Sequence, residues 1–225
     1  METAQPYIHH KKEETNEFEL DIDVEPHNGY PITQIVCSPK MEYAATLSEF
    51  DKSVVLWSID LKSHSLEYEN IISINNIDVG PGTSTTFTVS DDGFVAMKLR
   101  RLNPRNFEIY NLKIEIEISP LYFPYLHKNI SHLSFITNGN LVTISTNEHK
   151  AYILFPKKTN DNVKWIFKSM IELKNFSTSD KIYIAPKGKL IFFKEETYEI
   201  TIWNLETLMI EAQILLDWNL ISSAL

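Results

Sequence analysis

Three side chains of the types that form Ser-His-Asp hydrolase sites lie near one another in the sequence: His27, Ser48 and Asp51. In such a triad the serine attacks a carbonyl carbon, the histidine takes its proton and the aspartate orients the imidazole. These residue types therefore allow a nucleophilic site, provided that the fold brings the three side chains together.

Two further groups have the composition of a metal or acid–base site. Asp91-Asp92-Gly93 contains paired carboxylates, but this order is typical of a hairpin turn, which needs local side-chain hydrogen bonds and a positive φ. His9-His10 could join His27 around a metal ion, but a polar tail would hold these ligands loosely. We therefore predict no metal site and no cofactor.

The overall composition restricts the kinds of partner. The chain has 225 residues, and 21 Lys and Arg against 30 Asp and Glu give a formal net charge of -9, which disfavours nucleic acid. No apolar run approaches the roughly 18–20 residues that span a bilayer, so no direct membrane insertion is expected. Cys37 is the single cysteine and can form no internal disulfide. Because the first residues also lack a secretory signal, we expect a cytoplasmic protein.

A fourfold repeat indicates which elements would position these side chains. Four turns of small or polar residues are each followed about 15 to 17 residues later by an aromatic residue, and successive turns lie about 46 to 52 residues apart. The turns centre on Met41, Gly93, Gly139 and Gly188, and the aromatic residues are Trp57, Tyr110, Phe155 and Trp203. Such a period is typical of multi-stranded units that bury their faces against one another. We expect the aromatic side chains to anchor these units.

The remaining pattern predicts antiparallel sheets. Short apolar strands separated by turn residues begin after about residue 25. The expected organisation is a flexible polar tail at 1–24, four units at about 25–72, 73–119, 130–173 and 180–216, and the stub of a further unit at 217–225.

These features resemble the WD-repeat β-propellers, in which each unit is a four-stranded blade whose third strand ends in a Trp-Asp or similar pair. Ser38-Pro39 resembles the family's first turn, and Asp51 before Trp57 matches its tight-turn aspartate. Ser58 and Asn204 depart from the pattern by replacing the terminal aspartate. The resemblance, which covers about residues 27–215, implies an all-β fold: a partial or open propeller of about four antiparallel blades.

The resemblance also bears on the possible triad. In WD-repeat proteins a histidine, an aspartate, a serine or threonine and the tryptophan form a buried hydrogen-bonded tetrad, and His27, Ser48, Asp51 and Trp57 would take those places. A buried indole N–H and a buried imidazole both need hydrogen-bond partners, which these side chains would supply to one another. Because a buried tetrad is closed to substrate, the resemblance favours this structural network over a nucleophilic site, and we predict no catalytic residue.

The implied function is a non-catalytic protein-interaction scaffold that binds its partner through loops at one rim. A basic cluster is a candidate docking patch for an acidic peptide: Lys98, Arg100, Arg101 and Arg105. The first alternative is a cytosolic regulatory fragment related to a membrane ion-channel protein, because fungal proteins with a divergent repeat before a channel domain are similar over 32–59 and at Asp217-Trp218. The second alternative, and the third function considered, is a propeller-type hydrolase with carboxylates from several blades.

The last unit indicates that the ring stays open. The segment 210–220 is largely apolar and lacks the polar cap that a terminal repeat needs for solubility. We therefore expect a gap between the first and fourth units, and self-association through the open terminal blade.

Overall fold

Sixteen strands and one short 3₁₀ helix make up the computed structural model, which describes residues 25–74, 86–98, 107–111, 116–118, 130–158, 163–174, 177 and 180–216. The strands form four antiparallel sheets, each of four consecutive strands. The helix η1 (Pro26–Gly29) precedes the first sheet, which comprises β1 (Gln34–Cys37), β2 (Tyr43–Ser48), β3 (Ser53–Asp60) and β4 (Ser65–Ser73). The second comprises β5 (Phe87–Val89), β6 (Phe94–Lys98), β7 (Phe107–Asn111) and β8 (Ile116–Ile118). The third comprises β9 (Ile130–Phe135), β10 (Leu141–Ser145), β11 (Lys150–Lys158) and β12 (Val163–Glu172), and the fourth β13 (Lys181–Ala185), β14 (Lys189–Lys194), β15 (Glu199–Asn204) and β16 (Met209–Leu215).

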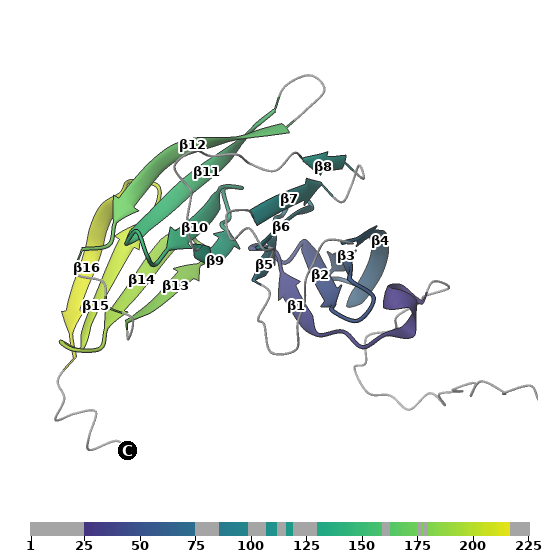
Figure 1. Cartoon of the computed structure of the whole chain (residues 1–225), viewed down its shortest axis with the longest axis horizontal. Coiled ribbons are helices and arrows are strands. Elements are labelled where there is room, and N and C mark those ends of the chain that lie inside the picture. Colours follow the sequence, from purple (N-terminus) through teal and green to yellow (C-terminus); the bar gives the residue numbers. More distant parts are fainter. Residues whose placement is uncertain are drawn as a thin grey trace, which may run out of the picture.

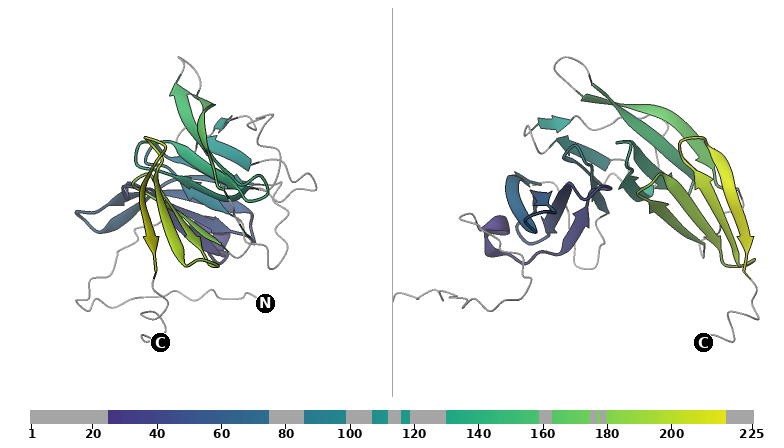
Figure 2. Two further views of the ribbon diagram at one scale, coloured as in Figure 1. Left: turned by 90° about the vertical axis from the view of Figure 1, so that its left-hand side faces the viewer. Right: turned by 180° about the vertical axis from the view of Figure 1, so that it is seen from behind.

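The sheets follow one another along an arc, with the first and fourth sheets at opposite ends (Figures 1 and 2). The first strand of one sheet contacts the first strand of the next, β1 with β5 and β5 with β9. This arrangement confirms the predicted fold class, an open propeller of four antiparallel blades. The tail at 1–24 and the stub at 217–225 lie outside the described residues.

Three apolar cores lie between successive sheets, because alternate residues of each strand face opposite neighbours. We call the face of a sheet that is turned toward the preceding sheet its leading face, and the face turned toward the following sheet its trailing face. The trailing face of the first sheet packs four fully buried side chains against the second sheet: Ala45, Leu47, Val54 and Leu56. The repeat therefore stabilises itself by burying one sheet face on another.

The turn between the first two strands of each blade has one residue at positive φ. Three blades have glycine there, Gly93, Gly139 and Gly188, with φ of 78°, 80° and 72°. Met41 holds the same place in the first blade at φ 62°, although its Cβ disfavours this region. The four predicted turn centres therefore coincide with the four positive-φ residues of these turns.

A register shift recurs between the third and fourth strands. It falls between Leu56 and Trp57, between Ile153 and Leu154, and between Ile202 and Trp203. Such an irregularity twists the strand locally and re-aims the following side chain. The extra residue lies in the fourth strand each time, as Glu69, Lys168 and Glu211, so the third strand keeps its alternation between the two faces.

Candidate functional site

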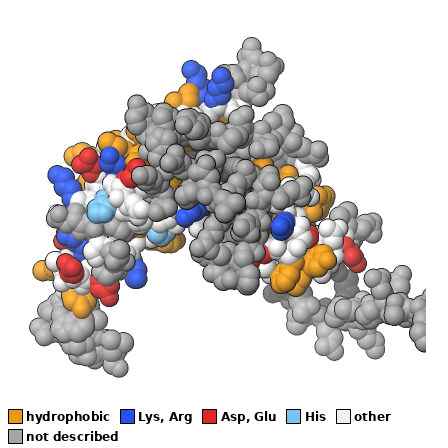
Figure 3. Space-filling view, in the orientation of Figure 1, with side chains coloured by type: hydrophobic (Ala, Val, Ile, Leu, Met, Phe, Trp, Pro, Cys, Tyr) orange, Lys and Arg blue, Asp and Glu red, His pale blue; other side chains and the backbone are white. Residues whose placement is uncertain are grey.

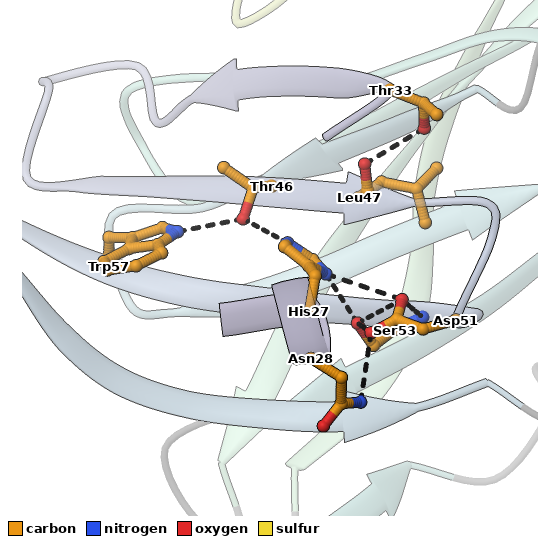
Figure 4. A network of polar contacts seen from close by, with 8 residues as sticks. All are labelled: His27, Asn28, Thr33, Thr46, Leu47, Asp51, Ser53 and Trp57. Carbon is orange, nitrogen blue, oxygen red and sulfur yellow. Dashed lines mark hydrogen bonds and ion pairs between the residues drawn. The ribbon is translucent and has the colours of Figure 1, made fainter. Parts of the chain in front are cut away.

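A continuous polar network lies inside the first blade and joins η1, β2, the β2–β3 turn and β3 (Figure 4). The Trp57 indole N–H donates to Thr46 Oγ1 at 2.9 Å, and Thr46 Oγ1 lies 2.8 Å from His27 Nε2. On the other side of the ring, His27 Nδ1 lies 2.5 Å from Ser53 Oγ. The Ser53 hydroxyl lies 2.8 Å from both carboxylate oxygens of Asp51. The ring of His27 is fully buried, so the network anchors η1 to the sheet.

The hydrogen-bond directions specify the protonation of His27. Burial lowers the pKa of His27, against a smaller raising effect of the Asp51 charge and hydrogen bond, and therefore favours the neutral imidazole. Because Ser53 donates to the Asp51 carboxylate, its oxygen accepts from His27 Nδ1–H. Thr46 then donates to His27 Nε2 while it accepts from Trp57. With His27 in this tautomer, every hydrogen-bond donor of the network between Trp57 and Asp51 has an acceptor.

Ser48 does not join this network, contrary to the expected tetrad. Its hydroxyl is buried and has no hydrogen-bond partner among the residues that the structure describes. Thr46, two residues earlier on the same face of β2, supplies the hydroxyl instead because it lies diagonally across from Trp57 in the β2–β3 register. Without a Ser48–His27 hydrogen bond, these side chains do not have the geometry of a Ser-His-Asp triad.

The four expected anchors occupy different environments. Trp57 is buried, whereas Tyr110 and Trp203, which pair with the second strand in the same register, are half-buried. In the third blade the expected residue, Phe155, is displaced by one position: Leu154 holds the matching place and is buried. The turn between the first two strands accounts for this correction. It has six residues in the first blade, from Ser38 to Tyr43, but five in the third, from Ile136 to Asn140, so the same count from the turn ends one residue past Leu154.

Trp203 borders a groove of about 370 Å³ between the third and fourth sheets. Apolar side chains of the groove are Leu173, Phe192 and Ile210, and its polar side chains include Lys174 and Glu199. The groove lies on the leading face of the fourth sheet, the face that carries the His27 network in the first.

An exposed aromatic pair lies directly beside the network. The rings of Tyr30 and Phe50 are stacked, with centroids 6.5 Å apart and planes at 5°. Their side chains are 52% and 65% exposed, respectively. Tyr30 follows η1 and Phe50 lies in the β2–β3 turn, the two segments that His27 and Asp51 connect. Asn28 adds a second link, since its Nδ2 donates to Asp51 Oδ2 at 3.5 Å. The buried network therefore positions an exposed apolar surface at the loop rim.

The structure locates few of the other candidate residues. Lys98 lies at the end of β6 and is half-buried, whereas Arg100, Arg101 and Arg105 fall outside the described residues, as do His9 and His10. Within the described ranges, no three His, Cys, Asp or Glu side chains are grouped so that they could hold a metal ion. None of the helices in this part of the chain has the length and hydrophobicity that crossing a bilayer requires.

Comparison with known proteins identifies the architecture but no closer relationship. No protein-family model matches the chain, and no curated protein matches it either. Among solved structures, the chain is similar to the WD40 domain of SCAP from fission yeast, with 12% identity and a TM-score of 0.56, over 85% of this chain and 46% of that one. It is also similar to a functionally unknown protein from Desulfotomaculum acetoxidans DSM 771, with 15% identity and a TM-score of 0.51, over 84% and 56% of the two chains.

A third similar structure is Hsv2 from Kluyvelomyces marxianus, with 12% identity and a TM-score of 0.51, over 81% of this chain and 61% of that one. The chain thus spans about half to three-fifths of the length of these proteins. At such low identity the similarity establishes the fold alone, and that fold is a WD40-like β-propeller, present here as four blades in an open arc.

Proposed function

We propose that this protein is a non-catalytic interaction scaffold that binds a protein partner through the loop rim of its first blade. The exposed, stacked pair of Tyr30 and Phe50 carries the proposal. Aromatic side chains contribute much of the binding energy at protein interfaces, and they cost little conformational entropy when they are already held in place.

The surroundings of the pair support this function. Ile32, close to Tyr30 along the chain, is 45% exposed and extends the apolar surface. Figure 3 shows hydrophobic side chains gathered at the lower right of the view, over the first sheet. Over the third and fourth sheets, hydrophobic side chains are mixed with side chains of both charge signs. Exposed apolar groups that are clustered in this way mark interaction sites more often than scattered ones do.

The His27 network explains why these loops can act as a binding surface. It connects the segment that carries Tyr30 to the turn that carries Phe50 through buried hydrogen bonds. A partner therefore meets a preorganised surface, on loops that the strands do not use for packing. We propose that the partner inserts an apolar side chain against the two rings.

Selection of peptides from a displayed random library on the purified protein tests this function. We expect the selected peptides to bind Tyr30→Ala and Phe50→Ala at least about tenfold more weakly than the unchanged protein, as truncated hot spots do. Leu61→Ala is the matched control, because Leu61 is also exposed but lies in the β3–β4 turn of the same sheet. Peptides that bind all four proteins equally would refute the assignment to this rim.

A further inference from the structure

The two ends of the arc expose apolar side chains at positions that are mostly buried where two sheets of the chain meet. The blades can be matched residue by residue from the turn after the first strand, where Ser38, Ser90, Ile136 and Ala185 each accept a hydrogen bond from the positive-φ residue of the turn. Counting back from these residues gives equivalent positions on β1, β5, β9 and β13.

The leading face of the first sheet is uncovered at its first strand. Ile35 is 64% exposed, whereas the equivalent residue of the fourth blade, Ile182, is 9% exposed, and those of the second and third, Phe87 and Leu133, are also buried. At the next position on this face, two residues further along the strand, Cys37 is exposed. Its equivalents are buried: Val89, Phe135 and Ile184.

The trailing face of the fourth sheet is uncovered in the same way. Ile191, Phe193, Ile200 and Ile202 are each partly exposed, although they match Ala45, Leu47, Val54 and Leu56, which are fully buried. Tyr183 on β13 extends this face and is 61% exposed. This face has the composition of a sheet interface and lacks only the neighbouring sheet.

We infer that the trailing face of the fourth sheet binds the leading face of the first sheet of a second copy, and that two copies close into an eight-bladed ring. The interface would repeat the contacts that already join blades within the chain, which is why a copy of this chain fits it. Two arcs of four blades give eight, within the range that closed propellers show. The solved structures similar to this chain also continue well beyond its length. A head-to-tail interface that closes after two copies gives a finite dimer.

The internal contacts specify which residues would meet. The Phe135 amide donates to Thr88 Oγ1 at 3.3 Å between the second and third blades. Cys37 holds the place of Phe135, and Tyr183 holds the place of Thr88. Cys37 of one copy therefore lies next to Tyr183 of the other in the proposed ring.

Mass measurement under reducing conditions is the first test. Light scattering should give twice the chain mass of 26.1 kDa for the unchanged protein. Ile35→Lys and Tyr183→Lys should each give the mass of one chain, and both replace exposed side chains, so folding should persist. An equimolar mixture of the two variants should recover the dimer, because one intact interface remains between them.

This design separates the possible arrangements. If two fourth sheets met face to face, Ile35→Lys would remain dimeric, and that result would overturn the proposal. A monomeric unchanged protein would overturn it as well, and would leave the trailing face to blades of another chain or to a different partner. Neither result depends on peptide binding at Tyr30 and Phe50.

Disulfide formation is the second test. Tyr183→Cys, oxidised at low concentration, should give a cross-linked dimer through Cys37 and should return to single chains on reduction. Tyr183→Cys combined with Cys37→Ser is the control and should give no such species through this pair. A cross-link of equal yield in that control, or none in Tyr183→Cys, would contradict the predicted neighbours.

Discussion

The first and third blades have the same strand pairing but differ in the side chains that lie between their strands. Their second and third strands pair in the same register, with Thr46 opposite Val55 in the first and Thr143 opposite Tyr152 in the third. A four-residue turn follows in both, and it ends in a residue at positive φ. The matching place of Trp57 is held by Leu154.

The polar network is confined to the first of these two blades. In the third, the Thr143 hydroxyl is buried without a hydrogen-bond partner among the described residues. Glu148, in the turn position of Asp51, instead accepts a hydrogen bond from the Tyr152 hydroxyl, and burial together with this carboxylate raises the pKa of Tyr152. Apolar packing around Leu154 is therefore sufficient to form a blade, whereas the His27 network serves to fix the loop that carries Tyr30.

The largest expected effect on stability comes from the loss of the Trp57 side chain. Trp57→Ala should lower the free energy of unfolding by about 3–5 kcal/mol, because it removes a large buried side chain and leaves Thr46 without its donor. Leu154→Ala, the matched change in the third blade, should cost about 2–5 kcal/mol through the cavity alone. Urea denaturation measures both, and a Trp57→Ala protein with an unchanged midpoint would contradict the buried network.

Removing the threonine hydroxyl at the centre of the second strand should show the difference between the first and third blades most clearly. Thr46→Val leaves the Trp57 N–H and the His27 Nε2 unpaired, so it should cost about 2–3 kcal/mol. Thr143→Val removes a hydroxyl that already lacks a partner, and Ser48→Ala does the same beside the network, so both should be neutral or slightly stabilising. Equal losses in Thr46→Val and Thr143→Val would show that the network adds nothing.

Acid should weaken the first blade in a way that depends on His27. Its pKa is lowered in the folded protein, so the unfolded chain binds the proton more tightly and acidification favours unfolding. The contribution is complete above the unfolded value of about 6.5 and is lost as the pH falls below it toward the folded value, by up to about 1.4 kcal/mol per pH unit. Denaturation at several pH values should show this loss in the unchanged protein and a smaller one in His27→Gln, which retains the other titrating groups.

The smallest effect concerns the turn after the first strand. Met41→Gly should stabilise the protein by up to about 1 kcal/mol, because it relieves a side chain at positive φ. Gly139→Ala, at φ 80° in the third blade, should destabilise it by about 1 kcal/mol or more through the backbone strain alone, since the nearest atom to the added Cβ is Asp92 Oδ2 at 4.0 Å, an ordinary contact. Thermal midpoints measure both changes, and a lower midpoint for Met41→Gly would be inconsistent with this account.

The sequence predicts those features that depend on spacing along the chain. The turns at Met41, Gly93, Gly139 and Gly188 and the relation of His27, Asp51 and Trp57 follow from such spacing. The open arc follows from the number of blades.

Features that depend on strand register were beyond reach. Thr46 rather than Ser48 is selected by the pairing of β2 with β3, and Leu154 rather than Phe155 by a first turn that is one residue shorter in the third blade. Spacing along the sequence does not reveal such a difference, because one residue more or less exchanges the two faces of a strand. Tyr30 and Phe50 were not identified because only the folded loops bring them together.

The uncovered trailing face of the fourth sheet also affects local opening of the backbone. In a repeat protein the resistance of each unit to unfolding comes from its own strands and from the neighbours on either side, and this unit has one neighbour. In the single-chain form, such as that expected of Tyr183→Lys, amide hydrogens of β14 and β15 should therefore exchange with solvent faster than those of β10 and β11, which are covered on both faces by sheets of the same chain. In the single chain, protection thus decreases from the third blade to the fourth, and the last blade can open while the third remains folded.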